Sequence, residues 1–221
     1  MASRPPAPEA GFAPLHQAAW YLRLHARMLA HGLPHYERAV EAHKRQLFGV
    51  LRGSVAEIGP GAGVNLTYYS PSVHWTGVEP NPFLHPLLER KAASAGLRAA
   101  QVTLGVAEAL PFGSASLDAV TSTLVLCTVR DLRQALREVV RVLKPGGRFV
   151  FIEHVAEPEQ RWRRAAQRLI RPLWEALFDG CQPHRDIGGA LAAAGFAHIE
   201  ASFFRAPLPL VGPHLAGYAV R

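Results

Sequence analysis

The stretch Val55-Ala-Glu-Ile-Gly-Pro-Gly-Ala-Gly63 decides the fold of this chain. Its apolar run ends in a carboxylate, Glu57. Three glycines follow at alternate positions: Gly59, Gly61 and Gly63. Glycines let a backbone turn tightly and approach a ligand closely. A second apolar run, at 75–78, ends in a second carboxylate, Glu79, which can accept both hydroxyls of a ribose. The two runs predict a nucleoside site at the carboxyl ends of neighbouring parallel strands.

Two other nucleotide-binding motifs do not fit this stretch. An NAD-binding turn requires G-x-G-x-x-G, and Val64 stands where its third glycine would pack helix on strand. A P-loop requires Gly-Lys followed by Ser or Thr, which the sequence lacks. A glycine-rich turn with no ligand is the remaining alternative. The two carboxylates, Glu57 and Glu79, disfavour it because both stand where a nucleoside needs them.

The composition is that of one globular domain. A chain of 221 residues with 49% hydrophobic residues fits a single α/β domain. No apolar run reaches about 18 residues, so we expect no membrane span. Residues 1–14 are rich in Ala and Pro and predict a disordered tail. Two cysteines make no disulfide framework, which favours a reducing, cytoplasmic location.

The chain is basic, with a net charge of +7. A basic balance can indicate nucleic acid, anionic lipid or an acidic ligand as partner. The densest group of cations is Arg161, Arg163, Arg164, Arg168 and Arg171. Neither zinc-finger spacing nor an aromatic RNA-binding motif accompanies it, so we expect no nucleic-acid partner.

Hydrophobic periodicity and turn residues predict alternating strands and helices. The predicted strands are 54–58, 74–79, 100–104, 117–126, 148–155, 198–204 and 212–220. The predicted helices are 15–30, 35–51, one starting after Gly63, 82–95, 131–143 capped by Asp131, 162–178 broken near Pro172, and 186–194. This order predicts an α/β fold: a Rossmann-like, seven-stranded, mostly parallel sheet with helices on both faces and an antiparallel last strand. Residues 15–221 form one domain, with an N-terminal helical cap (15–52) and a lid-like helical insertion (157–184).

Four motifs in order carry a resemblance to a known family. They are Glu57-x-Gly-x-Gly-x-Gly63, Gly105-Val-Ala-Glu-Ala-Leu-Pro-Phe112, Ser116-Leu-Asp-Ala-Val120 and Val142-Leu-Lys-Pro-Gly-Gly147. Together they resemble the class I, type 11 methyltransferases, which use S-adenosylmethionine (SAM). The resemblance implies a methyltransferase domain with SAM as its cofactor.

A closer resemblance runs from Tyr36 to Arg221. It is carried by Thr123-Leu-Val-Leu-Cys127, Glu153-His-Val-Ala-Glu-Pro158, Asp179-Gly-Cys181 and Val211-Gly-Pro-His-Leu-Ala-Gly-Tyr-Ala-Val220. These stretches are similar to the animal methyltransferase-like 7 group, thiol S-methyltransferases anchored in membranes of the endoplasmic reticulum and lipid droplets. The chain lacks their hydrophobic N-terminal anchor, so we expect at most a weak peripheral membrane contact.

The resemblance implies a set of cofactor-binding residues. The set is Glu57, Gly59, Pro60, Gly61, Asn65, Glu79, Pro80, Asn81, Ala107, Glu108 and Leu124. The first glycines and Glu57 hold the methionine end of SAM, and Glu79 takes the ribose hydroxyls. Asn65 either helps to bind the cofactor's carboxylate at a helix N-terminus or caps that helix.

Other members of the set lie on the adenine side or close the pocket. Pro80 and Asn81 line its side, and Leu124 closes the pocket after the fourth strand. The type 11 pattern commonly has an acidic adenine partner where this chain has Val106. The Ala107 backbone and Glu108 then have to cover the adenine edge.

His154, after the fifth strand, is the predicted catalytic residue. Methyl transfer from a sulfonium mainly needs alignment and desolvation, and a thiol reacts as its thiolate. His154 can act as a base or orient the substrate, and a structural histidine is the alternative. His184 and His214 are weaker candidates, with Cys181 lining the pocket and Cys127 in the core. We expect no metal site, because neither H-E-x-x-H nor C-x-x-C occurs.

The sequence therefore predicts methyl transfer from SAM to a small, apolar acceptor, with a thiol as first choice. One alternative is O-, N- or C-methylation of a natural product or a quinone-like lipid. Another is a noncatalytic SAM-binding interaction protein, which the full motif set disfavours. The fold does not fix the acceptor, and the oligomeric state is left open.

Overall fold

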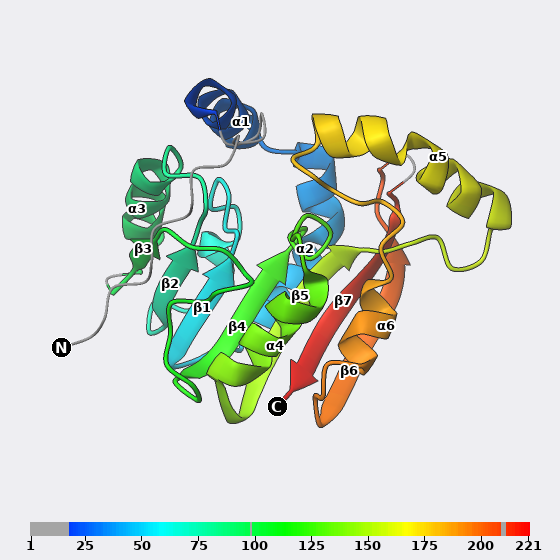
Figure 1. The fold of residues 1–221 in the computed structure, drawn as a ribbon. Coiled ribbons are helices and arrows are strands. Elements are labelled where there is room, and N and C mark those ends of the chain that lie inside the picture. The colour runs from blue at the N-terminus through cyan, green and yellow to red at the C-terminus, as the bar shows by residue number, and fades with distance from the viewer. Residues whose placement is uncertain (1–17, 98, 209–210) are drawn as a thin grey trace.

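A computed structural model describes residues 18–97, 99–208 and 211–221, and its centre is one seven-stranded sheet (Figure 1). The strand order is β3-β2-β1-β4-β5-β7-β6, and β7 runs antiparallel to both of its neighbours. The predicted sheet with an antiparallel last strand is confirmed. The strands are β1 (Ser54–Ile58), β2 (His74–Val78), β3 (Gln101–Thr103), β4 (Leu117–Thr123), β5 (Leu143–His154), β6 (His198–Arg205) and β7 (Pro213–Val220).

Helices cover both faces of the sheet, as predicted. Side chains of α2 and α3 join one buried apolar cluster, and those of α4 and α6 join another on the opposite face. α1 and α5 lie beyond the carboxyl ends of the parallel strands (Figure 1). The helices are α1 (Ala19–His31), α2 (Pro34–Phe48), α3 (His85–Ser94), α4 (Leu132–Val142), α5 (Arg161–Leu177) and α6 (Ile187–Ala192).

Two aspartates fix where helices on one face begin. The Asp131 side chain accepts a hydrogen bond from the Gln134 backbone N–H and caps α4, as the sequence predicts. Asp186 accepts from the Gly189 N–H in the same way and starts α6. The caps set the first turns of α4 and α6, and apolar side chains of both helices pack on the sheet.

The prediction of a helix after Gly63 is wrong. The loop after β1 holds only a short 3₁₀ helix, η2 (Leu66–Tyr68). Gly63 adopts a left-handed φ of 71°, and its N–H bonds to the Pro60 carbonyl, which commits the chain to a turn. The side chains of Asn65 and Tyr69 then turn inward to Glu57. Buried polar bonds therefore replace the expected helix.

Smaller differences concern element boundaries and the chain's N-terminus. α5 continues through Pro172, where we predicted a break. β4 ends at Thr123 instead of residue 126, because Leu124 adopts a left-handed φ of 57°. The predicted disordered tail, residues 1–14, lies outside the described residues. Within the described ranges, every helix is too short or too polar to cross a bilayer.

Candidate active site

The glycine loop after β1 packs directly against the loop after β4. Gly59 has a φ of 58°, and a Cβ there would lie 2.7 Å from Cγ2 of Val125. Its N–H donates to the Val78 carbonyl at 2.9 Å, which ties the loop to β2. Only glycine fits both the backbone conformation and the close approach. The loop therefore lies where β1, β2 and β4 end together.

Glu79 is buried beside this loop and is only 4% exposed. The Gly61 N–H donates to its Oε2 at 3.0 Å, and the Asn81 N–H donates to its Oε1 at 2.9 Å. Burial raises the pKa of the carboxyl, while these two backbone bonds lower it. Each oxygen keeps lone-pair capacity for a further donor. The arrangement can accept two hydroxyls at the end of β2.

Both carboxylate oxygens of Glu57, in β1, accept hydrogen bonds from other side chains of the protein. Its carboxylate accepts from Asn65 Nδ2 at 2.7 Å, Tyr69 Oη at 3.0 Å and Trp75 Nε1 at 2.9 Å. Burial raises the pKa of this carboxyl. The geometry gives Glu57 a role in positioning the glycine loop, and its direct contact with a cofactor stays a prediction.

Asn65 lies between this network and the end of β4. Its Nδ2 also donates to Thr123 Oγ1 at 3.2 Å, and its Oδ1 is buried without a hydrogen-bond partner among the described residues. The predicted helix N-terminus beside Asn65 is missing, so the side-chain oxygen is what the structure offers to a ligand.

The predicted adenine-side residues fall into two groups. Pro80 and Asn81 follow Glu79 directly, and Asn81 Nδ2 donates to the Leu22 carbonyl of α1 at 2.9 Å. Pro60, in the loop after β1, and Ala107, in the loop after β3, are both buried. The Glu108 carboxylate points to the loop before α4, where its Oε1 accepts hydrogen bonds from the backbone N–H groups of Arg130 and Asp131. Its carboxylate serves the start of α4, and a role at the adenine edge stays a prediction.

Leu124 stores backbone strain at the end of β4. A left-handed φ of 57° is rare for a residue other than glycine. Its N–H still pairs with the Ile152 carbonyl of β5, and the next N–H, of Val125, donates to Glu153 Oε1 at 3.1 Å. The strained residue turns the chain so that Val125 meets the glycine loop.

Unpaired polar atoms gather near the carboxyl-terminal part of β5. Among the described residues, six buried side-chain atoms have no hydrogen-bond partner, and most native buried polar groups have one. Four of the six are Tyr36 Oη, Glu153 Oε2, His154 Nδ1 and His214 Nε2. His154 and His214 are directly opposed on β5 and β7, and the Tyr36 ring lies 5.5 Å from that of His214. These atoms are buried polar groups with hydrogen-bonding capacity left for a ligand.

Two of these residues were missed by the sequence analysis. Burial and then the charge of Glu153 raise the pKa of the Tyr36 phenol, which places the two groups near each other. Tyr36 stands at the start of a helix, where no local pattern marks it. Glu153 adjoins the predicted His154, and that position was the available signal.

His154 contacts a sulfur. Its Nε2 lies 3.0 Å from Sγ of Cys181, and Trp174 Nε1 donates to the same sulfur at 3.3 Å. Ligand atoms of Cys127, His154 and Cys181 all lie within 4.8 Å of one another. The hydrogen bond with Cys127 lowers the pKa of the Cys181 thiol, and that bond together with burial raises the pKa of Cys127. Spacing along the sequence predicted no such group.

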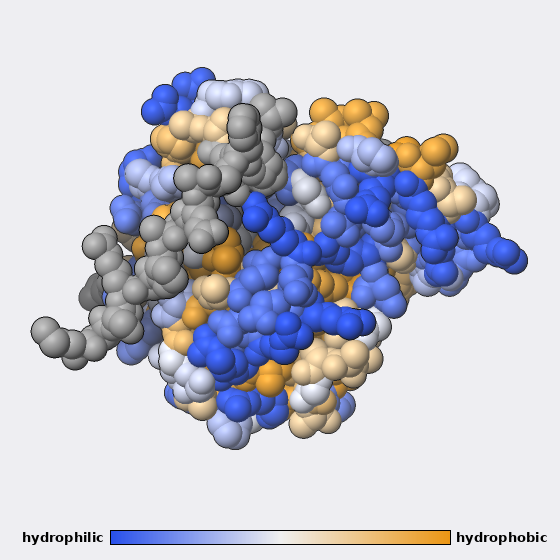
Figure 2. All heavy atoms as spheres, viewed as in Figure 1, coloured by the Kyte–Doolittle hydropathy of each residue, from blue (hydrophilic) through white to orange (hydrophobic). Residues whose placement is uncertain are grey.

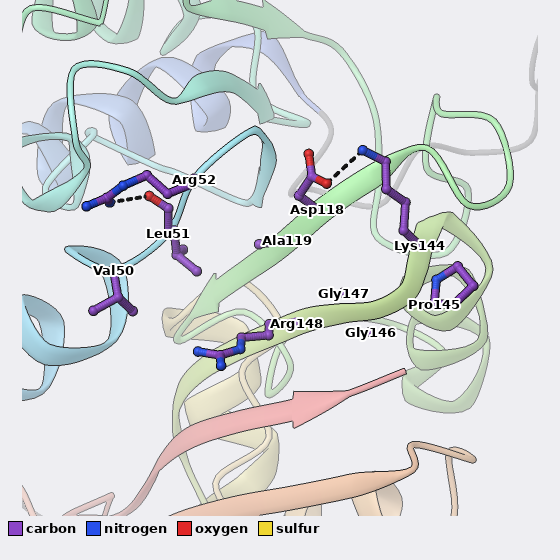
Figure 3. Close-up of a pocket in the computed structure, with 10 residues that line it drawn as sticks. All are labelled: Val50, Leu51, Arg52, Asp118, Ala119, Lys144, Pro145, Gly146, Gly147 and Arg148. Atoms are coloured by element: carbon purple, nitrogen blue, oxygen red, sulfur yellow. Dashed lines mark hydrogen bonds and ion pairs between the residues drawn. The ribbon is translucent and has the colours of Figure 1, made fainter.

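A separate surface pocket lies at the other end of the central strands, beside the starts of β4 and β5 (Figure 3). It has a volume of about 370 Å³, and an ion pair of 2.7 Å joins Lys144 and Asp118 in its wall. Ligands of open α/β sheets bind beyond the carboxyl ends of the strands, and this pocket lies at the amino end of β4. It is therefore not the candidate active site.

Comparison with known proteins agrees with the geometry. Residues 56–151 match the family model of the type 11 methyltransferase domain. Human thiol S-methyltransferase TMT1A is 38% identical over 84% of this chain and 81% of its own. Human thiol S-methyltransferase TMT1B is 36% identical over 85% of this chain and 82% of its own.

A solved structure shares the fold. The YcgJ protein of Bacillus subtilis superimposes with a TM-score of 0.61 at 20% identity, covering 83% of this chain and 96% of its own. At that identity the likeness shows the arrangement of strands and helices alone. The glycine loop and both carboxylates lie within or just beside the strands that this arrangement shares.

Proposed function

This chain belongs to the SAM-dependent methyltransferase family that includes the human thiol S-methyltransferases, and from that premise we propose that it methylates a small thiol. The enzyme class and the cofactor follow from the family. The acceptor is our proposal. One observation supports it most: Val125 packs on the glycine loop and its N–H bonds to Glu153, one of a group of buried residues that each leave a polar atom without a partner among the described residues.

The described residues fit SAM. Glu79 keeps capacity for two ribose hydroxyls, and Asn65 Oδ1 is a buried acceptor without a partner among the described residues. We propose that Asn65 accepts from the amino end of the cofactor and that Glu57 holds Asn65 in place. When bound, SAM supplies a methyl group on a sulfonium, which is a good leaving group.

The acceptor side lies across the Val125 contact from the glycine loop. We propose that the thiol enters near His154, whose ring faces the Cys181 sulfur. A thiol reacts as its thiolate, so His154 beside it would assist the loss of its proton. The buried surroundings exclude water from both partners, and alignment then supplies much of the rate.

We propose that α1 and α5 form a lid that touches membranes peripherally. Both helices lie over the same end of the sheet (Figure 1), and orange spheres line the upper edge over α5 in Figure 2. Several large apolar side chains of these helices are exposed: Trp20, Leu24, Met28, Trp162, Leu169, Leu173 and Leu177. The apolar stripe of α5, formed by Leu169, Leu173 and Leu177, faces solvent, with Leu169 83% exposed, whereas Trp174 packs against the core.

The charges of α5 and the free cysteines support membrane contact and a reducing compartment, respectively. The arginines of α5 are exposed beside the apolar stripe, an arrangement that can lie on an anionic bilayer. Each cation near such a surface contributes about 1 kcal/mol. Both cysteines are free thiols, which suits a reducing compartment. We propose a cytoplasmic enzyme that binds membranes reversibly.

An acceptor screen tests the proposed function. The purified enzyme is mixed with SAM and with matched alkyl thiols, phenols and amines, and release of S-adenosylhomocysteine is measured. We expect turnover with thiols and little with the others. Faster turnover of a phenol, an amine or a quinone-like lipid would replace the thiol as acceptor. SAM binding without turnover of any acceptor would favour a noncatalytic protein.

A further inference from the structure

We propose that Cys127, His154 and Cys181 form a binding site for a transition-metal ion, with Zn²⁺ as the ion that suits them best. Their ligand atoms lie within 4.8 Å of one another, so one ion can reach all three. Two thiolates and an imidazole are a common zinc set. Hard ions such as Mg²⁺ prefer oxygen ligands and would be excluded.

Hydrogen bonds to backbone carbonyls hold the loops that carry the two cysteines together. The Gln182 N–H donates to the Cys127 carbonyl at 2.9 Å. Arg185 Nη1 donates to the carbonyls of Leu126 and Val129 at 2.7 and 2.6 Å. His154 is the last residue of β5, so the sheet holds this ligand while the hydrogen bonds between the loops hold the two cysteines. Metal sites need this kind of preorganisation.

The surroundings also suit a metal. Exposed fractions of the three residues are only 1%, 3% and 8% in chain order. His154 has no partner for Nδ1 among the described residues, and the sulfur near its Nε2 is a weak acceptor. Its ring is therefore not held by the strong hydrogen bonds expected of a structural histidine. Two thiolates and a divalent ion together are neutral, which makes their burial less costly.

Trp174 adds a supporting contact. Its Nε1 donates to Cys181 Sγ at 3.3 Å, from α5. A hydrogen bond to a ligating sulfur orients the ligand and tunes the metal. The site is thereby linked to the proposed lid.

Three protein ligands leave one position of a tetrahedral ion open, which is typical of catalytic zinc. Resting on the proposed function, we infer that the acceptor thiol takes this position and loses its proton to water on binding. A lone pair of the bound sulfur forms the new S–CH₃ bond. The electron pair of the broken C–S bond goes to the sulfur of S-adenosylhomocysteine. His154 then acts as a ligand instead of as the base.

The experiment measures metal directly. The full chain is purified without chelator, its metal content is determined, and the metal is replaced by Co²⁺. We expect about one equivalent of ion per chain, with thiolate-to-cobalt charge-transfer bands and the strong visible bands of a tetrahedral site. Cys127→Ser, Cys181→Ser and His154→Gln should each weaken Co²⁺ binding at least roughly tenfold. His198→Gln, on exposed β6, is the matched control and should bind as the wild type does.

Three further readouts keep the outcomes separate. The chain has only two cysteines, so a thiol titration after unfolding counts both. A folded protein with two free thiols, no bound metal and no cobalt bands would overturn the site. A Cys127–Cys181 disulfide in the chelator-free protein would also overturn it. Unchanged SAM affinity in the variants shows that the cofactor side is intact.

The pH profile links the site to the reaction. With an alkyl thiol, the metal-free enzyme should gain rate between about pH 6 and pH 9 as free thiolate forms. The metal-loaded enzyme should show a flatter profile, because a coordinated thiol is already deprotonated. Identical profiles would overturn the role of the ion in activating the thiol. Cobalt binding with no turnover of any thiol would instead overturn the proposed function and support the metal site.

Discussion

The two sides of the active site satisfy their buried polar groups in opposite ways. On the cofactor side, both oxygens of Glu57 and both oxygens of Glu79 have partners within the protein. On the acceptor side, Glu153, His154 and His214 each leave a buried atom without a partner among the described residues. The carboxylates of the cofactor side form a rigid frame in which Asn65 Oδ1 alone lacks a partner among the described residues, whereas several atoms of the acceptor side are left for what binds there.

This difference separates stability from chemistry. Removing a partner from a satisfied network leaves buried donors unpaired, which costs folding free energy. Removing an atom that has no partner costs little folding free energy but alters what can bind. Variants on the two sides should therefore differ in which measurement they change.

Glu79→Ala should have the largest effect. Each charge-assisted hydrogen bond to a ribose hydroxyl contributes about 1.5–3 kcal/mol, so losing two should weaken SAM binding by at least roughly a hundredfold. Calorimetry measures the change, with Glu89→Ala on exposed α3 as the control. NAD should bind neither protein. Unchanged SAM affinity would remove Glu79 from the site and with it the idea of a cofactor frame.

His154→Ala should lower turnover of an alkyl thiol by roughly tenfold or more, since a group that assists proton loss contributes at least that much. SAM affinity should stay within about twofold, because the two sides act separately. Steady-state kinetics and calorimetry on the same preparation measure both. Wild-type turnover across the pH range would give His154 a purely structural role.

Two buried tyrosines offer a matched pair. Tyr69 Oη donates to Glu57 and contacts Thr121 Oγ1 at 2.7 Å, whereas Tyr36 Oη has no partner among the described residues. Tyr69→Phe should lower the free energy of unfolding by about 1–3 kcal/mol, and Tyr36→Phe should change it little. Urea denaturation measures both. Equal losses would contradict the contrast between the two sides.

Membrane contact should be a weaker effect and should involve the helices of the proposed lid. Leu169→Asp and Leu173→Asp in α5 should reduce sedimentation with anionic liposomes, because apolar area and charge both favour that surface. Neutral liposomes and high salt are the controls. Equal recovery of the wild type in the supernatant with anionic and neutral vesicles at low salt would leave α5 as a lid only.

The smallest effect concerns the junction that leads into α5. Hydrogen bonds from Arg205 lower the pKa of Glu157 to about 2. A depressed pKa stabilises the fold above the unfolded value of about 4.3, and that stabilisation is lost as the pH falls toward 2. The difference in unfolding free energy between wild type and Glu157→Gln should therefore shrink on acidification. A difference that does not change with pH would exclude this ion pair as its source.

The cofactor side could be predicted because its residues lie in one short stretch. Two strands, the glycines and both carboxylates all fall between residues 54 and 79. On the acceptor side, His154, His214 and Cys181 could be named singly but the grouping could not be predicted, because Cys127, His154, Cys181 and His214 come from segments far apart in the sequence. The missing helix after Gly63 was a local error, since no propensity shows that Asn65 and Tyr69 would bond to Glu57 instead.

The short link between β1 and β2 has a consequence for how the chain folds. Ser54 pairs with His74, a separation of 74 − 54 = 20 residues, whereas Val55 pairs with Ala119, a separation of 119 − 55 = 64. Closing the shorter loop costs about 1 kcal/mol less entropy. Trp75 and Tyr69 also reach Glu57 within this segment. We therefore expect the parallel β1–β2 unit to form early in refolding, so that variants at Tyr69 slow refolding more than they speed unfolding.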